Sequence, residues 1–195
     1  MSPKTSGQFK EIRADKKQLI IDTALNLFAN KGYHASSISM IAKEAKISKG
    51  LMYNYFDSKE ALLREIFEDF IRIIMDLMNP NHDDEITTEE MRDFLSSYFQ
   101  LVEQNHLYWK LYFQLSVKSE IFDLLVNDFY SEQMEKTQRL INRYFSERFK
   151  EPDIEISLFF SILKGFALDY LHSYKTYPQS KIEGFKKKMF EMFLR

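Results

Sequence analysis

The scarcity of helix-breaking residues constrains this chain most. Only five Gly and four Pro occur among its 195 residues, and few segments alternate apolar and polar residues for long enough to be strands. Apolar residues instead recur three and four apart, as on one face of an α-helix. We therefore predict an all-α fold of about nine helices. They are expected at about residues 14–30, 39–45, 49–56, 87–104 and 120–149, with others from Asp57, around Trp109, from Pro152 and from Ser180.

Composition and motifs exclude several classes of protein. The apolar share of 45% and the charged share of 29% are those of a folded globular chain, and the absence of Cys rules out disulfides and Cys-ligated metals. Residues 1–8 lack the apolar core of a signal peptide, and no run approaches the ~18 apolar residues of a membrane span. No metal-ligand spacing, paired nucleophile and base, or Gly-rich phosphate loop is present. We expect a cytoplasmic protein without membrane contact, enzymatic activity, metal or cofactor.

Charge is distributed unevenly along the chain. Residues 1–60 hold ten Lys and Arg against six Asp and Glu, a balance of +4, whereas residues 61–195 hold seventeen against twenty-three, a balance of −6. A basic end on an acidic body favours contact between that end and a polyanion such as nucleic acid. We therefore predict two domains, residues 1–60 and residues 61–195.

Residues 37–59, SISMIAKEAKISKGLMYNYFDSK, carry the most specific pattern. A short helix over 39–45 leads into a three-residue turn whose apolar member is Ile47, and Ser48 can cap the helix that follows. In that helix Met52 and Phe56, four residues apart, face inward and leave a basic and aromatic outer face. This arrangement is typical of a helix-turn-helix motif that places its second helix in the DNA major groove.

The outer face of this motif is predicted to contact DNA. Lys49 offers a cation to guanine or phosphate, and Gly50 reduces the bulk of the helix where it enters the groove. Tyr53 and Tyr55 carry phenolic donors suited to phosphate oxygens, and Lys59 adds a cation. Alternatively, the tyrosines are packing residues and the lysines are merely solvated. The predicted DNA-binding residues are Ser37, Ser39, Lys49, Gly50, Leu51, Tyr53, Asn54, Tyr55 and Lys59.

Residues in and around this motif match the pattern of a known family. They are Ala24, Leu27, Phe28, Gly32, Tyr33, Ser37, Ile38, Ile41, Ala42, Ala45, Ile47, Ser48, Gly50, Met52, Tyr53, Tyr55, Phe56, Ser58, Lys59 and Leu62. Over residues 13–65 the chain thus resembles the TetR (tetracycline-repressor-like) transcriptional regulators. Lys46 departs from the family by replacing the usual Gly of the turn, at roughly 1 kcal/mol in the left-handed conformation. Leu51 replaces a common Thr and can contact only a thymine methyl group.

The resemblance implies a C-terminal domain that dimerises through its last two long helices and binds a small molecule. The residues support a dimer independently, because Ser157, Ser161 and Gly165 recur every four positions and form a ridge that another helix can approach closely. A wholly intramolecular core would explain the same pattern. The predicted dimer-interface residues are Ser157, Ser161, Gly165, Phe185 and Met189.

Aromatic side chains are the candidates for lining a ligand pocket. The chain has 18 Phe, 11 Tyr and 9 Met, and a broad pocket lined by such residues suits an apolar or aromatic effector. His106 and His172 are candidate polar contacts for it. Alternatively, each aromatic is plain core and each histidine is a surface or internally satisfied residue, which is the commoner case. The predicted pocket residues are Phe94, Tyr98, Trp109, Tyr112, Phe113, Phe129, Phe166 and Tyr170.

The sequence therefore predicts a homodimeric, ligand-responsive DNA-binding regulator. We expect a repressor that binds an inverted-repeat operator in double-stranded DNA and is released by a small apolar or aromatic effector. One alternative is an all-helical small-molecule or lipid-binding protein without DNA function. Another is a helix-turn-helix activator or adaptor recruited by protein contacts.

Overall fold

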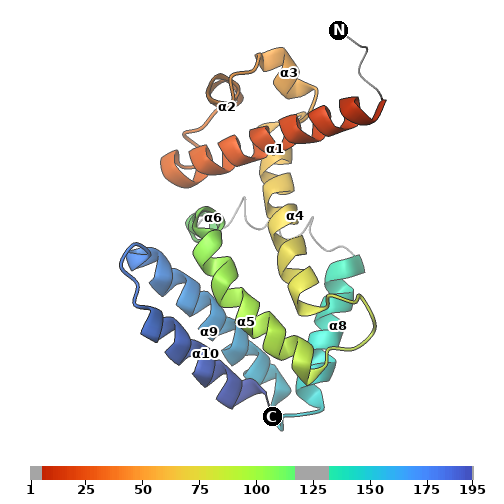
Figure 1. Cartoon of the computed structure of the whole chain (residues 1–195), viewed down its shortest axis with the longest axis vertical. Coiled ribbons are helices and arrows are strands. Elements are labelled where there is room, and N and C mark those ends of the chain that lie inside the picture. The colour runs from red at the N-terminus through yellow and green to blue at the C-terminus, as the bar shows by residue number, and fades with distance from the viewer. Residues whose placement is uncertain (1–5, 117–131, 195) are drawn as a thin grey trace. The chain divides into compact units, whose positions relative to one another are not determined.

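The computed structural model describes residues 6–116 and 132–194, which form nine α-helices and no strand (Figure 1). The chain divides into two compact units, one ending at Asp69 and the other starting at Phe70. This boundary lies nine residues beyond the expected end of the first domain at residue 60, inside helix α4 (Lys59–Met78). The prediction of an all-helical chain is confirmed for the residues described.

The first unit is built on α1 (Ser6–Lys31). Ile20, Ala24 and Phe28 lie on its inner face and are at most 1% exposed. Gly32 ends the helix with φ +90, and its N–H donates to the carbonyl of Phe28, which is the left-handed cap that Gly adopts at least cost. The helix begins eight residues before the expected start at Ala14, over a segment with no apolar stripe to signal it.

Two short helices form the helix-turn-helix. They are α2 (Ile38–Glu44) and α3 (Lys49–Tyr53), and each is capped by a serine, because Ser37 Oγ accepts from the Met40 N–H and Ser48 Oγ accepts from the Leu51 N–H. Lys46 occupies the turn with φ 55, so the turn adopts the left-handed conformation despite lacking Gly. Helix α3 ends three residues before the expected Phe56, which is nevertheless buried.

Helix α4 begins at Lys59, two residues after the start expected at Asp57. The Ala61 N–H donates to Ser58 Oγ at 3.0 Å, so Ser58, and not Asp57, caps the helix. The first eleven residues of α4 belong to the first unit, and Phe70–Met78 belong to the second.

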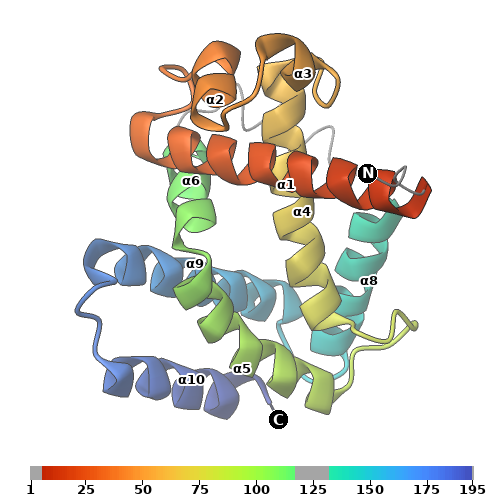
Figure 2. The same ribbon diagram turned by 45° about the horizontal axis from the view of Figure 1, so that its top comes forward.

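Five further helices complete the second unit, and Figure 2 shows α9 and α10 running alongside each other. They are α5 (Thr88–Gln104), α6 (His106–Ser116), α8 (Glu132–Ser146), α9 (Pro152–Ser173) and α10 (Gln179–Phe193). Thr87 and Glu90 form a capping box at the start of α5, and Pro152 occupies the first turn of α9. Helix α8 accounts for the second half of the helix expected at 120–149, and the residues before 132 lie outside the described ranges.

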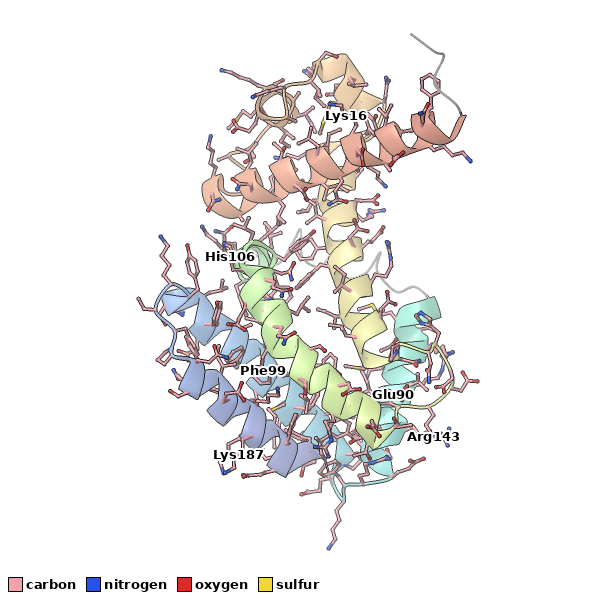
Figure 3. The ribbon with its side chains drawn as sticks, in the orientation of Figure 1. Lys16, Glu90, Phe99, His106, Arg143 and Lys187 are labelled. Atoms are coloured by element: carbon pink, nitrogen blue, oxygen red, sulfur yellow. The ribbon has the colours of Figure 1, made fainter. Side chains whose placement is uncertain are left out.

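The core of the second unit consists largely of aromatic rings. Phe99 on α5, labelled in Figure 3, packs edge-to-face on Phe166 of α9 with ring centroids 4.7 Å apart. Phe159, which is fully buried, contacts the rings of Phe145 and Phe193 at 5.4 and 5.1 Å. Aromatic pairs of this geometry add about 0.5–1.5 kcal/mol each beyond the area they bury.

Candidate nucleic-acid interface and ligand cavity

Helix α3 presents an exposed polar and aromatic surface. Lys49 and Gly50 are both exposed, and a Cβ atom built on Gly50 would meet no atom within 4 Å. Tyr53 is 46% exposed, and the ammonium of Lys49 lies 6.0 Å from its ring centroid. Space at Gly50 beside a cation and a phenol is what a helix needs to approach the edges of base pairs.

The other predicted DNA-binding residues divide into exposed and partly covered groups. Ser37, Ser39 and Asn54 are exposed, and Leu51 and Tyr55 are partly buried. The hydroxyl oxygen of Ser37 accepts the capping hydrogen bond and keeps its own proton to donate. The structure thus brings eight of the nine predicted residues to accessible positions around α2 and α3.

Lys59, the ninth, is partly buried and makes contacts within its own unit, and its contact with DNA stays a prediction. Its ammonium donates to the carbonyls of Tyr33 and Ser36, both at 3.1 Å, and lies 4.2 Å from the centroid of the Tyr33 ring. These contacts tie the start of α4 to the loop between α1 and α2. Lys59 is therefore a structural residue, and the sequence could not show this because its partners lie 23 and 26 positions away.

A second polar tie joins the same two segments. The Tyr33 hydroxyl donates to Glu60 Oε1 at 3.0 Å. Burial and the neighbouring carboxylate raise the pKa of the Tyr33 phenol. The pKa of Glu60 is lowered, first by a hydrogen bond from its own backbone and also by the bond from Tyr33. The tie holds the helix-turn-helix against α4 without using its outer face.

Arg13 is an interface residue that sequence reasoning missed. Its guanidinium lies 5.6 Å from the centroid of the Tyr55 ring and 3.5 Å from the carbonyl oxygen of Asn54. It therefore borders the end of α3, although 41 positions separate it from Asn54. A Lys- and Arg-rich stretch at 10–17 was the available signal.

The predicted pocket residues pack mainly into the core. Phe94, Tyr98, Trp109, Phe166 and Tyr170 are at most 7% exposed. The Tyr98 hydroxyl donates to the Leu163 carbonyl at 2.8 Å, and its burial raises the pKa of this phenol. Two further predicted residues, Tyr112 and Phe113, pack partly buried against the same core. Phe129 lies outside the described residues. Whether any of them contacts a ligand stays a prediction.

A cavity of about 240 Å³ lies elsewhere in the second unit. Its walls come from α4, α8 and α9, and seven of the nine lining side chains are apolar. None of the seven predicted pocket residues that the structure describes is among them, because aromatic content cannot distinguish a packed ring from a cavity wall. The lining residues are Ile71, Ile74, Met75, Met78, Met134, Thr137, Gln138, Ile141 and Phe160.

Helix α9 leaves an apolar face exposed. Ile154, Leu158 and Leu168 are 56%, 44% and 41% exposed, and the small residues Ser157, Ser161 and Gly165 lie exposed between them. Phe185 is partly buried, whereas Met189 is 1% exposed and belongs to the core of its own chain. Met189 is therefore unavailable to a partner, and its assignment to the dimer interface is wrong.

Neither a candidate membrane span nor a candidate metal site occurs among the described residues. In those ranges, no helix combines the length and apolar character that crossing a membrane requires. No group of three or more His, Asp or Glu there is placed to hold a metal ion.

Comparison with known proteins identifies sequences that are similar to this helix-turn-helix segment. The sequence family described as "Bacterial regulatory proteins, tetR family" matches residues 20–66. The Staphylococcus epidermidis biofilm operon icaADBC HTH-type negative transcriptional regulator IcaR is 34% identical over 104 residues, which are 53% of this chain and 55% of IcaR. The Bacillus subtilis fatty acid metabolism regulator protein is 33% identical over 92 residues, 47% of each chain. The matches thus span about half the length of these relatives.

Solved structures share the fold over most of the chain. The transcriptional regulator FadR from Bacillus subtilis, in complex with stearoyl-CoA, gives a TM-score of 0.69 at 20% identity, covering 91% of this chain and 97% of that one. A TetR family transcription regulator from Marinobacter aquaeolei VT8 gives 0.71 at 15% identity, covering 94% and 97%. The matched segment is a helix-turn-helix of the kind found in bacterial regulatory proteins, and the solved structures share the helical fold of the described residues. Residues 20–66 match the TetR family model, as the motif at residues 37–59 predicts.

Proposed function

We propose that the protein is a homodimeric repressor that binds an inverted-repeat operator and releases it when an apolar ligand binds. The observation that carries the proposal is the exposed surface of α3, where Lys49 and Tyr53 flank the open space at Gly50. Lys49 would contact a guanine or a phosphate, and Tyr53 a phosphate oxygen. Because its partner would be chromosomal DNA, we place the protein in the cytoplasm.

The exposed face of α9 supports the dimer. A glycine inside a helix costs roughly 0.5–1 kcal/mol relative to alanine, and a Cβ atom on Gly165 would meet nothing within 4 Å in its own chain. Internal packing therefore does not explain this glycine, whereas the close approach of a second copy does. A symmetric dimer would present two α3 helices roughly 34 Å apart, one turn of DNA.

The cavity supports an apolar effector. Pockets for drug-sized ligands have volumes of roughly 300–1,000 Å³, so the smaller cavity of about 240 Å³ suits one apolar chain or a small apolar molecule. Two of the similar proteins are named for fatty acid metabolism or solved with stearoyl-CoA. We therefore propose a fatty acyl compound, with its chain among the Ile and Met side chains of α4 and α8.

Helix α4 would couple the two sites. Ile71, Ile74 and Met78 line the cavity near its C-terminal end, and Lys59 at its N-terminal end holds the loop before α2. A ligand that fits only one position of α4 would lower DNA affinity, and operator would weaken ligand binding by the same factor. A coupling of about 1–3 kcal/mol is typical of such systems.

Selection of genomic DNA fragments by the purified protein tests the function. We expect enrichment of an inverted repeat, weaker DNA binding in the Lys49→Ala variant, and release by stearoyl-CoA. A matched control, Lys187→Ala, removes an exposed cation of the second unit and should bind DNA as the wild type does. Failure to enrich any DNA would overturn the proposal and favour the alternative of a small-molecule-binding protein without DNA function.

Two variants test the proposed dimer and ligand site separately. Gly165→Leu should shift the protein from dimer to monomer in light scattering, because a bulky side chain would separate the two α9 helices. Ile141→Phe should weaken stearoyl-CoA binding tenfold or more, since overfilling an apolar site costs about 1–3 kcal/mol. A wild-type monomer, or unchanged ligand affinity in Ile141→Phe, would remove the corresponding part of the proposal.

A further inference from the structure

The N-terminal half of α1 projects beyond the helix-turn-helix with its side chains exposed. Residues 7–16 are all exposed, and Phe9 is 60% exposed. Figures 1 and 2 both show this end of α1 extending past α2 and α3. A helical segment with so little packing leaves much of its surface available to a partner.

One stripe of α1 changes character along its length. Lys10, Arg13 and Lys17 are spaced three and four apart, and the same spacing continues into Ile20 and Ala24. In the second half of the helix this stripe is buried against the helix-turn-helix core. In the first half it carries cations instead.

The acidic residues of this segment lie elsewhere on the helix. Glu11 and Asp15, four residues apart, follow a stripe on the opposite side of α1. The segment therefore has a basic side and an acidic side. A basic side of this kind complements a polyanion, whereas the acidic side is left facing solvent.

Contacts orient the basic stripe toward the end of α3. Arg13 lies over the Tyr55 ring at 5.6 Å, and the Lys17 ammonium lies 5.9 Å from the centroid of the Phe56 ring. Lys17 is also paired with Glu65 at 2.6 Å, which neutralises it. Lys10 and Arg13 are left as the cations beside the predicted DNA face.

We propose that Lys10 and Arg13 on α1 form a second DNA contact, binding backbone phosphates next to the major groove that α3 enters. The proposal rests on the proposed operator binding and extends it to an element outside the helix-turn-helix. Such contacts add affinity that depends on salt and carries little sequence preference. Arg13 would also position Tyr55, because its guanidinium covers one face of that ring.

Salt titrations of operator binding test this contact. In Lys10→Ala and Arg13→Ala, we expect the slope of log affinity against log salt to fall by about 0.9 for each phosphate that is no longer neutralised, with about fivefold weaker binding per phosphate near 0.15 M salt. Arg13→Lys should restore most of the slope, because it keeps the charge. Lys187→Ala, whose side chain lies exposed on α10 (Figure 3), should leave the slope unchanged.

Footprinting distinguishes this proposal from the proposed function. Hydroxyl-radical footprints of the wild type should show protected backbone flanking each half-site, and Lys10→Ala with Arg13→Ala should remove that flanking protection while keeping the central protection. Unchanged slopes and footprints in the double variant, with the wild type still bound to operator, would overturn the second contact alone. A wild type that binds no DNA would overturn both.

Discussion

The two units of this chain are stabilised by different kinds of contact. In the first unit, Lys59 and Glu60 of α4 make directional hydrogen bonds to the loop between α1 and α2. In the second unit, rings such as Phe159 and Phe166 pack edge-to-face across several helices. Hydrogen bonds fix one geometry, whereas apolar packing is non-directional and tolerates rearrangement. Under the proposed function, the first unit would need a fixed surface for DNA and the second would need to accommodate a ligand, which these two kinds of contact suit.

Removing a central ring should have the largest effect. Phe159→Ala deletes a fully buried ring that contacts four others, and such deletions cost about 3–5 kcal/mol. Trp109, the single Trp of the chain and a member of this core, reports unfolding of the second unit by its fluorescence. We expect a lower urea midpoint by that signal. A destabilisation below about 1 kcal/mol would show that the rings repack freely and are not a cooperative core.

Lys59→Ala should have the second largest effect and should destabilise the first unit. Hydrogen bonds to charged groups contribute about 1.5–3 kcal/mol, and Lys59 makes two of them. We expect faster amide hydrogen exchange in residues 20–56, with Trp109 fluorescence unfolding as in the wild type. Lys49→Ala, an exposed matched control, should leave exchange unchanged and weaken DNA binding. Equal exchange rates in both variants would contradict the structural role of Lys59.

Replacing the turn residue Lys46 should have a smaller effect, and this effect should be stabilising. Its φ of 55 is a conformation that Gly adopts more readily, so Lys46→Gly should raise the free energy of unfolding by up to about 1 kcal/mol. Lys43→Gly, in the neighbouring helix, should lower it by about the same amount. Denaturation followed by far-UV circular dichroism measures both, and a destabilised Lys46→Gly would show that the turn gains from its lysine.

The smallest expected effect concerns Glu60 and the loss of folding stability in acid. Because the pKa of Glu60 is lowered in the folded chain, the unfolded chain binds its proton more tightly. Its contribution to stability is present above the ordinary pKa of 4.5 and is lost as the pH falls below that value. Glu60→Gln should therefore flatten the decline of stability in acid. Hydrogen exchange of residues 33–37 at neutral and acidic pH measures it, and an identical decline in both proteins would refute it.

Local signals in the sequence predicted most of the first unit. Gly32 and Ser48 cap helices as their positions indicate, because capping depends on residues at most four positions apart. The roles of Lys59 and Arg13 were not predictable, since their partners come from distant segments. Periodicity shows that a residue faces inward but does not identify the residues it meets.

The second unit was predicted less completely for the same reason. Met189 and Gly165 both follow helical periodicity, yet one is buried and the other exposed. In the sequence, the apolar residues of α4 cover more than one helical stripe, and some of them form the wall of the cavity. Nothing in that pattern shows whether a neighbouring helix fills the space, because a cavity depends on side chains from three helices.

The length of α4 turns small displacements into larger ones. Its 20 residues span about 30 Å at 1.5 Å per residue. A small rotation of the helix about its Met78 end would therefore displace its Lys59 end by a larger distance. A tilt of about 4° about Met78 would carry Lys59 sideways by about 2 Å over such a length. The Lys59 ammonium donates to the carbonyls of Tyr33 and Ser36. A displacement of Lys59 would therefore be transmitted to Ser37, the cap of α2. Under the proposed function, a ligand no bulkier than one acyl chain would therefore be sufficient to displace the start of α2.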